Sequence, residues 1–137
     1  MVIKRVMLMV EWQTGQLVQG VVSYAHSHNW HLVLWHAGDV RDALQNWQGD
    51  GIIASLPYPN LFTRENLTDT DMKLVSLVPL KYQSIPYSLV RENDRAIGEL
   101  AAGYFIKCGY TNFGTYSTSL RGKRFCEVLK EQGVDKC

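Results

Sequence analysis

Residues 6–10 read VMLMV, an unbroken apolar run near the start of a chain of 137 residues. A strand with one face in water alternates apolar and polar side chains, whereas a strand of a parallel sheet covered on both faces is apolar throughout. The run therefore predicts a buried central strand that ends near Glu11.

Outward from this run, short apolar segments alternate with segments whose apolar residues recur at helical spacing. Further strands are predicted at residues 30–35, 51–56, 74–78, 87–90 and 112–116. Helices are predicted around residues 17–25, 43–47, 97–108 and 125–132. Such alternation, with right-handed crossovers, is typical of an α/β fold with a doubly wound, mostly parallel sheet and helices on both faces.

Composition excludes several classes of protein. The 14 Lys and Arg nearly balance the 13 Asp and Glu, so there is no broad basic face, and we do not expect these residues to bind DNA themselves. The three cysteines are widely spaced and predict no disulfide framework, which favours a reducing compartment. No apolar run is long enough for a signal peptide or a membrane span, so a cytoplasmic location is expected.

Several enzyme motifs are missing. The segment after residue 10 has neither a Gly-rich dinucleotide turn nor a Walker lysine. Ser55 ends a predicted strand but lacks the flanking glycines of a nucleophile elbow. The sequence therefore predicts no catalytic residue, no metal site and no cofactor, and the chain is not expected to be an enzyme.

Three large side chains are candidates for ligand binding. Trp12 and Trp35 follow or end predicted strands, at the edge where open α/β sheets bind ligands, and each could stack on a sugar ring or fill the core. Arg121 opens the last predicted helix, and its planar guanidinium could face the oxygens of a ligand or simply lie on a solvated helix face. The residues alone leave these alternatives open.

Three segments together resemble a known family. Residues 47–54, WQGDGIIA, resemble the W-x-G-D-G-I-I-A signature of xylose-operon regulators of the AraC/XylS class. Residues 93–102, NDRAIGELAA, with Gly109 after them, resemble the D-[ND]-x-A-x-G-x-L-A-A segment of these regulators, and residues 121–125 resemble their R-x-x-x-F. The sensor domain of that family is similar to the core of the lactose and galactose repressors and to type I periplasmic sugar-binding proteins.

The resemblance implies an organisation and a site. Residues 1–110 would form lobe one of a sugar-sensing domain and residues 111–137 the first strand and helix of lobe two, with the rest of the sensor and a DNA-binding domain beyond Cys137. Small residues of the NDRAIGELAA segment would let its helix lie close to the sheet. The positions that would grip a sugar between the lobes are Glu11, Trp12, Ser55, Asn93, Asp94 and Arg121, with Trp35 a further candidate. Asn93 stands where the family has Asp, which changes the pattern of hydroxyl groups that it would recognise.

The implied function is that of the effector-binding part of a transcription regulator of carbohydrate metabolism. A pentose-like sugar would close two lobes and so switch the attached helix-turn-helix domains, which alone would contact DNA. A homodimer without membrane contact is expected, because two-fold proteins match paired half-sites. The alternatives are the solute-binding protein of a sugar importer and a stand-alone flavodoxin-like enzyme.

Overall fold

The computed structural model describes residues 3–10, 15–35, 39–56, 61–67, 71–80, 85–116 and 119–134. The chain divides into two compact units, Met1–Arg91 and Glu92–Cys137, here called the first and the second unit. Among the described residues, every helix is too short or too polar to cross a membrane.

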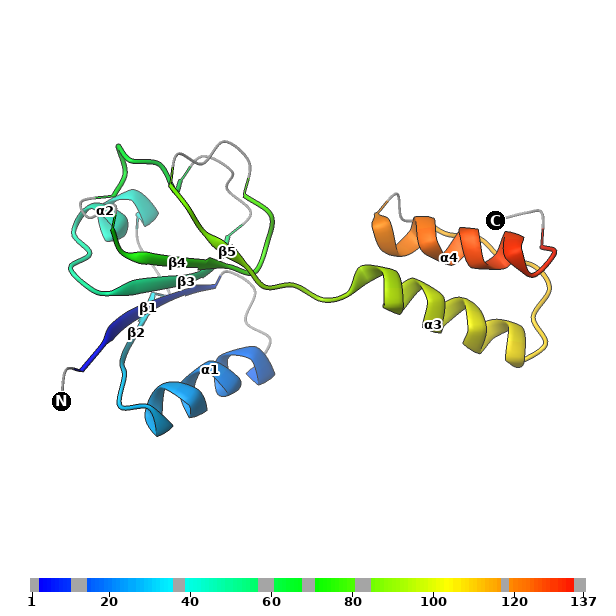
Figure 1. Ribbon diagram of the computed structural model, residues 1–137, viewed down its shortest axis with the longest axis horizontal. Coiled ribbons are helices and arrows are strands. Elements are labelled where there is room, and N and C mark those ends of the chain that lie inside the picture. Colours follow the sequence, from blue (N-terminus) through cyan, green and yellow to red (C-terminus); the bar gives the residue numbers. More distant parts are fainter. Residues whose placement is uncertain are drawn as a thin grey trace. The chain divides into compact units, whose positions relative to one another are not determined.

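The first unit is a parallel sheet with two helices (Figure 1). The strands are β1 (Arg5–Val10), β2 (His31–Trp35), β3 (Gly51–Ser55), β4 (Lys73–Ser76) and β5 (Ser88–Leu89). The helices are α1 (Gly15–Ser27), between β1 and β2, and α2 (Val40–Gln45), between β2 and β3. All strand pairs are parallel and the strand order is β2-β1-β3-β4-β5. The predicted α/β fold with a doubly wound sheet is therefore confirmed.

Strand β1 lies inside the sheet, as its unbroken apolar run predicts. Leu8 pairs with Leu34 of β2 on one side and with Ile53 of β3 on the other. Leu8 and Met9 are both fully buried, although they point to opposite faces of the sheet. Burial of consecutive residues is what a strand covered on both faces requires.

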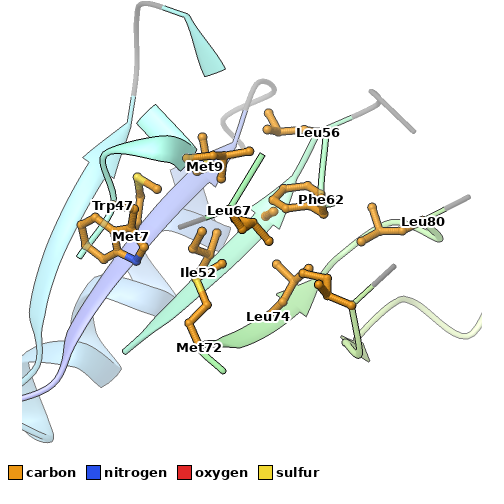
Figure 2. Packing of buried hydrophobic residues seen from close by; sticks show 13 residues of the cluster. Met7, Met9, Trp47, Ile52, Leu56, Phe62, Leu67, Met72, Leu74 and Leu80 are labelled. Atoms are coloured by element: carbon orange, nitrogen blue, oxygen red, sulfur yellow. The ribbon is translucent and has the colours of Figure 1, made fainter. Parts of the chain in front are cut away.

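One face of the sheet carries the main hydrophobic core (Figure 2). Met7, Ile52 and Leu74 point into it from neighbouring strands, and Trp47 covers it from the segment after α2. Phe62, from the segment between β3 and β4, is 1% exposed and lies among these side chains. A polar segment of the sequence thus supplies one of the largest core residues.

The entry into β3 is a tight turn, as the glycines there predict. A Cβ atom at Gly49 would lie 2.8 Å from the carbonyl oxygen of Arg5, and a Cβ at Gly51 would lie 2.9 Å from that of Lys73. Real Cβ atoms do not approach so closely, so the backbones of neighbouring strands leave no space for a side chain at either position.

The second unit consists of α3 (Asp94–Lys107) and α4 (Leu120–Glu131), which pack side by side and run in the same direction (Figure 1). Asn93 caps α3 by accepting a hydrogen bond from the N–H of Ala96, and Ser119 caps α4 in the same way. Gly109 follows α3 with a φ of +81°, the left-handed conformation that a glycine just after a helix favours.

The small residues of α3 are predicted to bring the helix close to a sheet, but in the structure they bring it close to α4. Gly98 and Ala102 are buried, and a Cβ at Gly98 would lie 2.5 Å from the carbonyl oxygen of Arg121. A small residue shows only that some backbone approaches closely, and the sequence does not show which one, so the close approach at Gly98 is to α4 and the packing of α3 on a sheet stays a prediction.

Residues 112–116, predicted to form a sixth strand, are described and form no strand. A strand needs a hydrogen-bonded neighbour, and no described residue provides one. Phe113 instead places its ring against that of Phe125, with centroids 6.1 Å apart. The structure divides the chain after Arg91, whereas the predicted lobe boundary follows residue 110; the assignment to lobes stays a prediction.

The cysteines also differ from expectation. Cys108 is free and exposed, but Cys126 is disulfide-bonded. The prediction of unpaired cysteines is therefore wrong for Cys126, because spacing along the sequence does not show which sulfur atoms the fold brings together.

Candidate functional site

The strand order places a candidate site at the carboxyl ends of β1 and β3. Ligands of open α/β sheets bind where the strand order reverses, and here that point lies between these two strands. Val10 and Ser55 end the two strands and are register partners, and Ser55 is half-buried there. Glu11 and Trp12, the other predicted ligand contacts at this edge, lie outside the described residues.

Trp35 ends β2 and pairs with Met9 of β1. Its side chain packs against the hydrophobic core, and its buried indole N–H has no hydrogen-bond partner among the described residues. Of the two roles open for this residue, packing in the core is the one that the structure favours over an open ring for sugar stacking.

The other three predicted residues come together in the second unit. Arg121 donates a hydrogen bond from Nε to Oδ1 of Asp94 at 2.7 Å, and its Nη2 lies 3.9 Å from Oε2 of Glu92. Asn93 lies between the two acidic residues along the chain and caps α3. We call Glu92, Asn93, Asp94 and Arg121 the helix-start cluster, because they lie where α3 and α4 begin.

Packing of the two helices positions the helix-start cluster. Gly98 lets α4 approach α3 closely, so the first turns of the two parallel helices lie together. The side chain of Asp94 is only 19% exposed, whereas that of Arg121 is 47% exposed. The carboxylate therefore holds one edge of the guanidinium while the rest of that group reaches solvent.

This arrangement suits recognition of hydroxyl groups. A guanidinium presents up to five N–H donors in a plane, and a carboxylate accepts two or more hydroxyl protons, so the two together can bind neighbouring hydroxyls of a polyol. The sequence did not single out Glu92. A signal was present, since Glu92 directly precedes the NDRAIGELAA segment, but one acidic residue at a helix start is too common to be informative.

Arg124 also joins α4 to α3, and it does so with a side chain that is largely buried. Its Nε donates to Oε1 of Glu99 on α3 at 2.7 Å, and its Nη1 donates to Glu127 and Glu131 on α4. Its side chain is only 15% exposed. Arg121 and Arg124 thus both contact α3 from α4, but the side chain of Arg124 is far less exposed.

The Arg124 contacts predict a dependence of stability on pH. The hydrogen bond from Arg124, with the charges of Arg124 and Arg95, lowers the pKa of Glu99 from its ordinary value of 4.5. A carboxyl with a lowered pKa in the folded state contributes stability above its unfolded pKa and loses that contribution as the pH falls through the folded pKa. The protection of the α3 and α4 amides against hydrogen exchange, after correction for the pH dependence of intrinsic exchange, should therefore decrease in acid.

Replacing Arg124 with Met tests this dependence. The variant should lose stability in α3 and α4 at neutral pH and show a smaller further loss in acid than the parent protein. Lys123→Met, which removes an exposed charge from the same turn, is the control and should keep the parent's pH profile. If Arg124→Met lost as much stability in acid as the parent protein does, the loss of stability would have to come from carboxyl groups other than Glu99.

A hollow of about 510 Å³ lies at the opposite edge of the sheet. Lys4, Asp50 and Lys73 line it, at or just before the starts of β1, β3 and β4. Oδ2 of Asp50 accepts a hydrogen bond from the backbone N–H of Arg5, so this carboxylate is occupied structurally. None of the predicted site residues lines this hollow.

No group of three or more His, Cys, Asp or Glu side chains in the described part of the chain is arranged to hold a metal ion. Comparisons with known protein families and with curated proteins find no match to this chain. The functional argument therefore rests on the residues and their arrangement.

Proposed function

We propose that this chain is the effector-binding part of a transcription regulator of carbohydrate metabolism, and that its effector is a pentose-like sugar or polyol. The observation that carries the proposal is the contact between Arg121 and Asp94, with Asn93 beside them. Asp94 and Arg121 are 27 positions apart in the sequence, and the fold joins their side chains directly.

Several features support a sensor in this role. The sheet is doubly wound, and Ser55 lies at its switch point. Asp94 and Arg121 offer acceptors and donors side by side, which suits a ligand with many hydroxyl groups. Such a ligand would favour the closed form of two lobes and shift the population of the attached DNA-binding domains.

The rest of the proposal follows from the resemblance. DNA would be bound by a helix-turn-helix domain beyond Cys137, the regulator would act as a homodimer in the cytoplasm, and no catalysis would occur. The near-neutral net charge of the chain supports the proposal that these residues bind the effector and that a different domain binds DNA.

Ligand-dependent stabilisation of the full-length protein tests the proposal. In a panel of aldopentoses, aldohexoses and polyols, one class should raise the unfolding temperature, since a ligand at a hundred times its Kd stabilises by about 2.7 kcal/mol. Arg121→Ala should abolish this increase, because the donors on the ligand oxygens are lost.

The matched control is Lys123→Ala, two residues along the same helix and exposed. It should keep the wild-type response. A panel without any stabilising compound, or an Arg121→Ala protein that still responds fully, would remove the helix-start cluster from the site.

One observation favours a second candidate, the solute-binding protein of a sugar importer. Cys126 is disulfide-bonded, and disulfides persist mainly in exported proteins. Both candidates would bind sugar, so the ligand panel does not separate them. Sugar-dependent binding of the full-length protein to promoter DNA would support the regulator, whereas recovery from the periplasm would support the importer component.

The third candidate, a flavodoxin-like enzyme, shares the strand order β2-β1-β3-β4-β5, with its flavin at the same switch point. An absorption spectrum of the purified protein distinguishes it. Visible flavin absorbance would favour this candidate over a sugar sensor.

A further inference from the structure

Helix α3 carries an apolar face that is turned away from α4. Gly98 and Ala102 are buried against α4, whereas Leu100 and Tyr104 are 77% and 64% exposed. Ile97, three residues before Leu100, is also exposed. Side chains at spacings of three and four share one side of a helix, so these three residues form a continuous apolar surface.

A shallow groove of about 690 Å³ runs along this surface. It is lined by Ala96, Glu99, Leu100, Gly103, Tyr104 and Lys107. Gly103 has no side chain, and a Cβ atom there would meet nothing within 4 Å. The groove is therefore lowest at Gly103, with large apolar side chains beside it and one acidic and one basic residue toward its two ends.

We propose that this groove binds the same groove of a second copy of the chain, with the two α3 helices antiparallel. The residues are placed symmetrically for this. The midpoint between Leu100 and Tyr104 is position 102, and the midpoint between Glu99 and Lys107 is position 103. A two-fold axis between positions 102 and 103 brings Leu100 of each copy near Tyr104 of the other, and Glu99 of each copy near Lys107 of the other.

Charge decides the direction of the pairing. In a parallel pair Glu99 would face its own counterpart and Lys107 likewise, which is unfavourable. In the antiparallel pair each acid faces a base, and both contacts occur twice because the interface is isologous. Oε1 of Glu99 accepts from Arg124 and lies 3.4 Å from Nε of Arg95, and in the proposed pair Oε2 would face Lys107 of the other copy.

The size of the surface predicts a weak dimer. One helix face buries less area than a stable interface needs, so association should depend on concentration. The proposed function also involves a second copy, but this inference is carried by the groove and its charges. The proposed function and the proposed dimer can fail independently. Sugar binding is measured as an increase in the unfolding temperature, whereas dimer formation is measured as an increase in molecular mass.

Sedimentation equilibrium of the chain, from low micromolar to millimolar concentration, tests the inference. The wild type should change from monomer to dimer, and Gly103→Gln should weaken association at least tenfold by filling the lowest point of the groove. Gly20→Gln on α1 is the matched control, because a Cβ at Gly20 also meets nothing within 4 Å. It should associate as the wild type does.

Two further variants identify the surface and the direction. Leu100→Gln should prevent dimerisation without lowering the unfolding temperature, since this side chain is exposed. Lys107→Glu should weaken the dimer at low ionic strength and less in high salt, because Glu99 then faces a like charge. A wild type that stays monomeric at every concentration, a Gly103→Gln protein that dimerises normally, or a Leu100→Gln protein that unfolds more easily would each overturn the inference.

Discussion

Replacing Phe62 with alanine should lower the free energy of unfolding of the first unit by about 3–5 kcal/mol. Phe62 is 1% exposed and lies among the side chains of the core in Figure 2. Its removal loses the transfer free energy of a large ring and leaves a cavity, because close-packed neighbours relax only in part. Phe62 belongs to a segment without regular secondary structure. The expected loss is nevertheless large, because its ring is buried in the core.

Urea unfolding followed by tryptophan fluorescence measures this loss, since all four tryptophans precede residue 92. The control is Leu34→Ala in β2, where the side chain is 47% exposed and the expected loss is about 1 kcal/mol or less. Equal losses for the two variants would show that the segment around Phe62 does not close the core.

Replacing Gly98 with alanine should destabilise the pair of helices α3 and α4 by about 1–3 kcal/mol, although alanine is the better helix former. The added Cβ would lie 2.5 Å from the carbonyl oxygen of Arg121 and 3.0 Å from the amide nitrogen of Phe125. Both are backbone atoms of α4, so the helices must separate. The contact between Asp94 and Arg121 should lengthen as a result.

Hydrogen exchange of the amides of α3 and α4 reports this change directly. The control is Gly103→Ala on the same helix, where nothing lies within 4 Å of the new atom. It should slow exchange, in line with a gain of about 0.5–1 kcal/mol in helix propensity. If Gly98→Ala also slowed exchange, close packing of α3 on α4 would be wrong.

The proposed binding of a ligand by the helix-start cluster would depend on the packing of α3 against α4. Asp94 holds Arg121 at 2.7 Å only while α3 and α4 pack through Gly98. We therefore expect Gly98→Ala to weaken any sugar response of the full-length protein along with Arg121→Ala. Gly103→Ala, which leaves this packing intact, should not.

The parallel sheet was predictable from local pattern. The unbroken apolar run at residues 6–10, the alternation of strands and helices, and Gly109 after α3 are each decided by neighbours in the sequence. Phe62 could not be placed in this way. Its segment is polar and has no apolar period, so only contacts with distant strands show that its ring is buried.

The site was predictable only in part. Asp94 and Arg121 were both named as candidates, but nothing in either segment shows that their side chains touch or that Glu92 lies beside them. Arg121 and Arg124 look alike in the sequence. Their roles differ because Arg124 faces Glu99 across the helix interface, whereas half of the Arg121 side chain reaches solvent.

The sequence by itself determined which segments become strands and helices, since periodicity, caps and glycine turns act over a few residues. Tertiary structure decided what each element packs against: Gly98 against α4, Trp35 in the core, and residues 112–116 without a strand partner in the described part of the chain. The physical reason is that burial and pairing depend on contacts between distant segments. A small or apolar residue shows that it needs a neighbour but does not identify that neighbour.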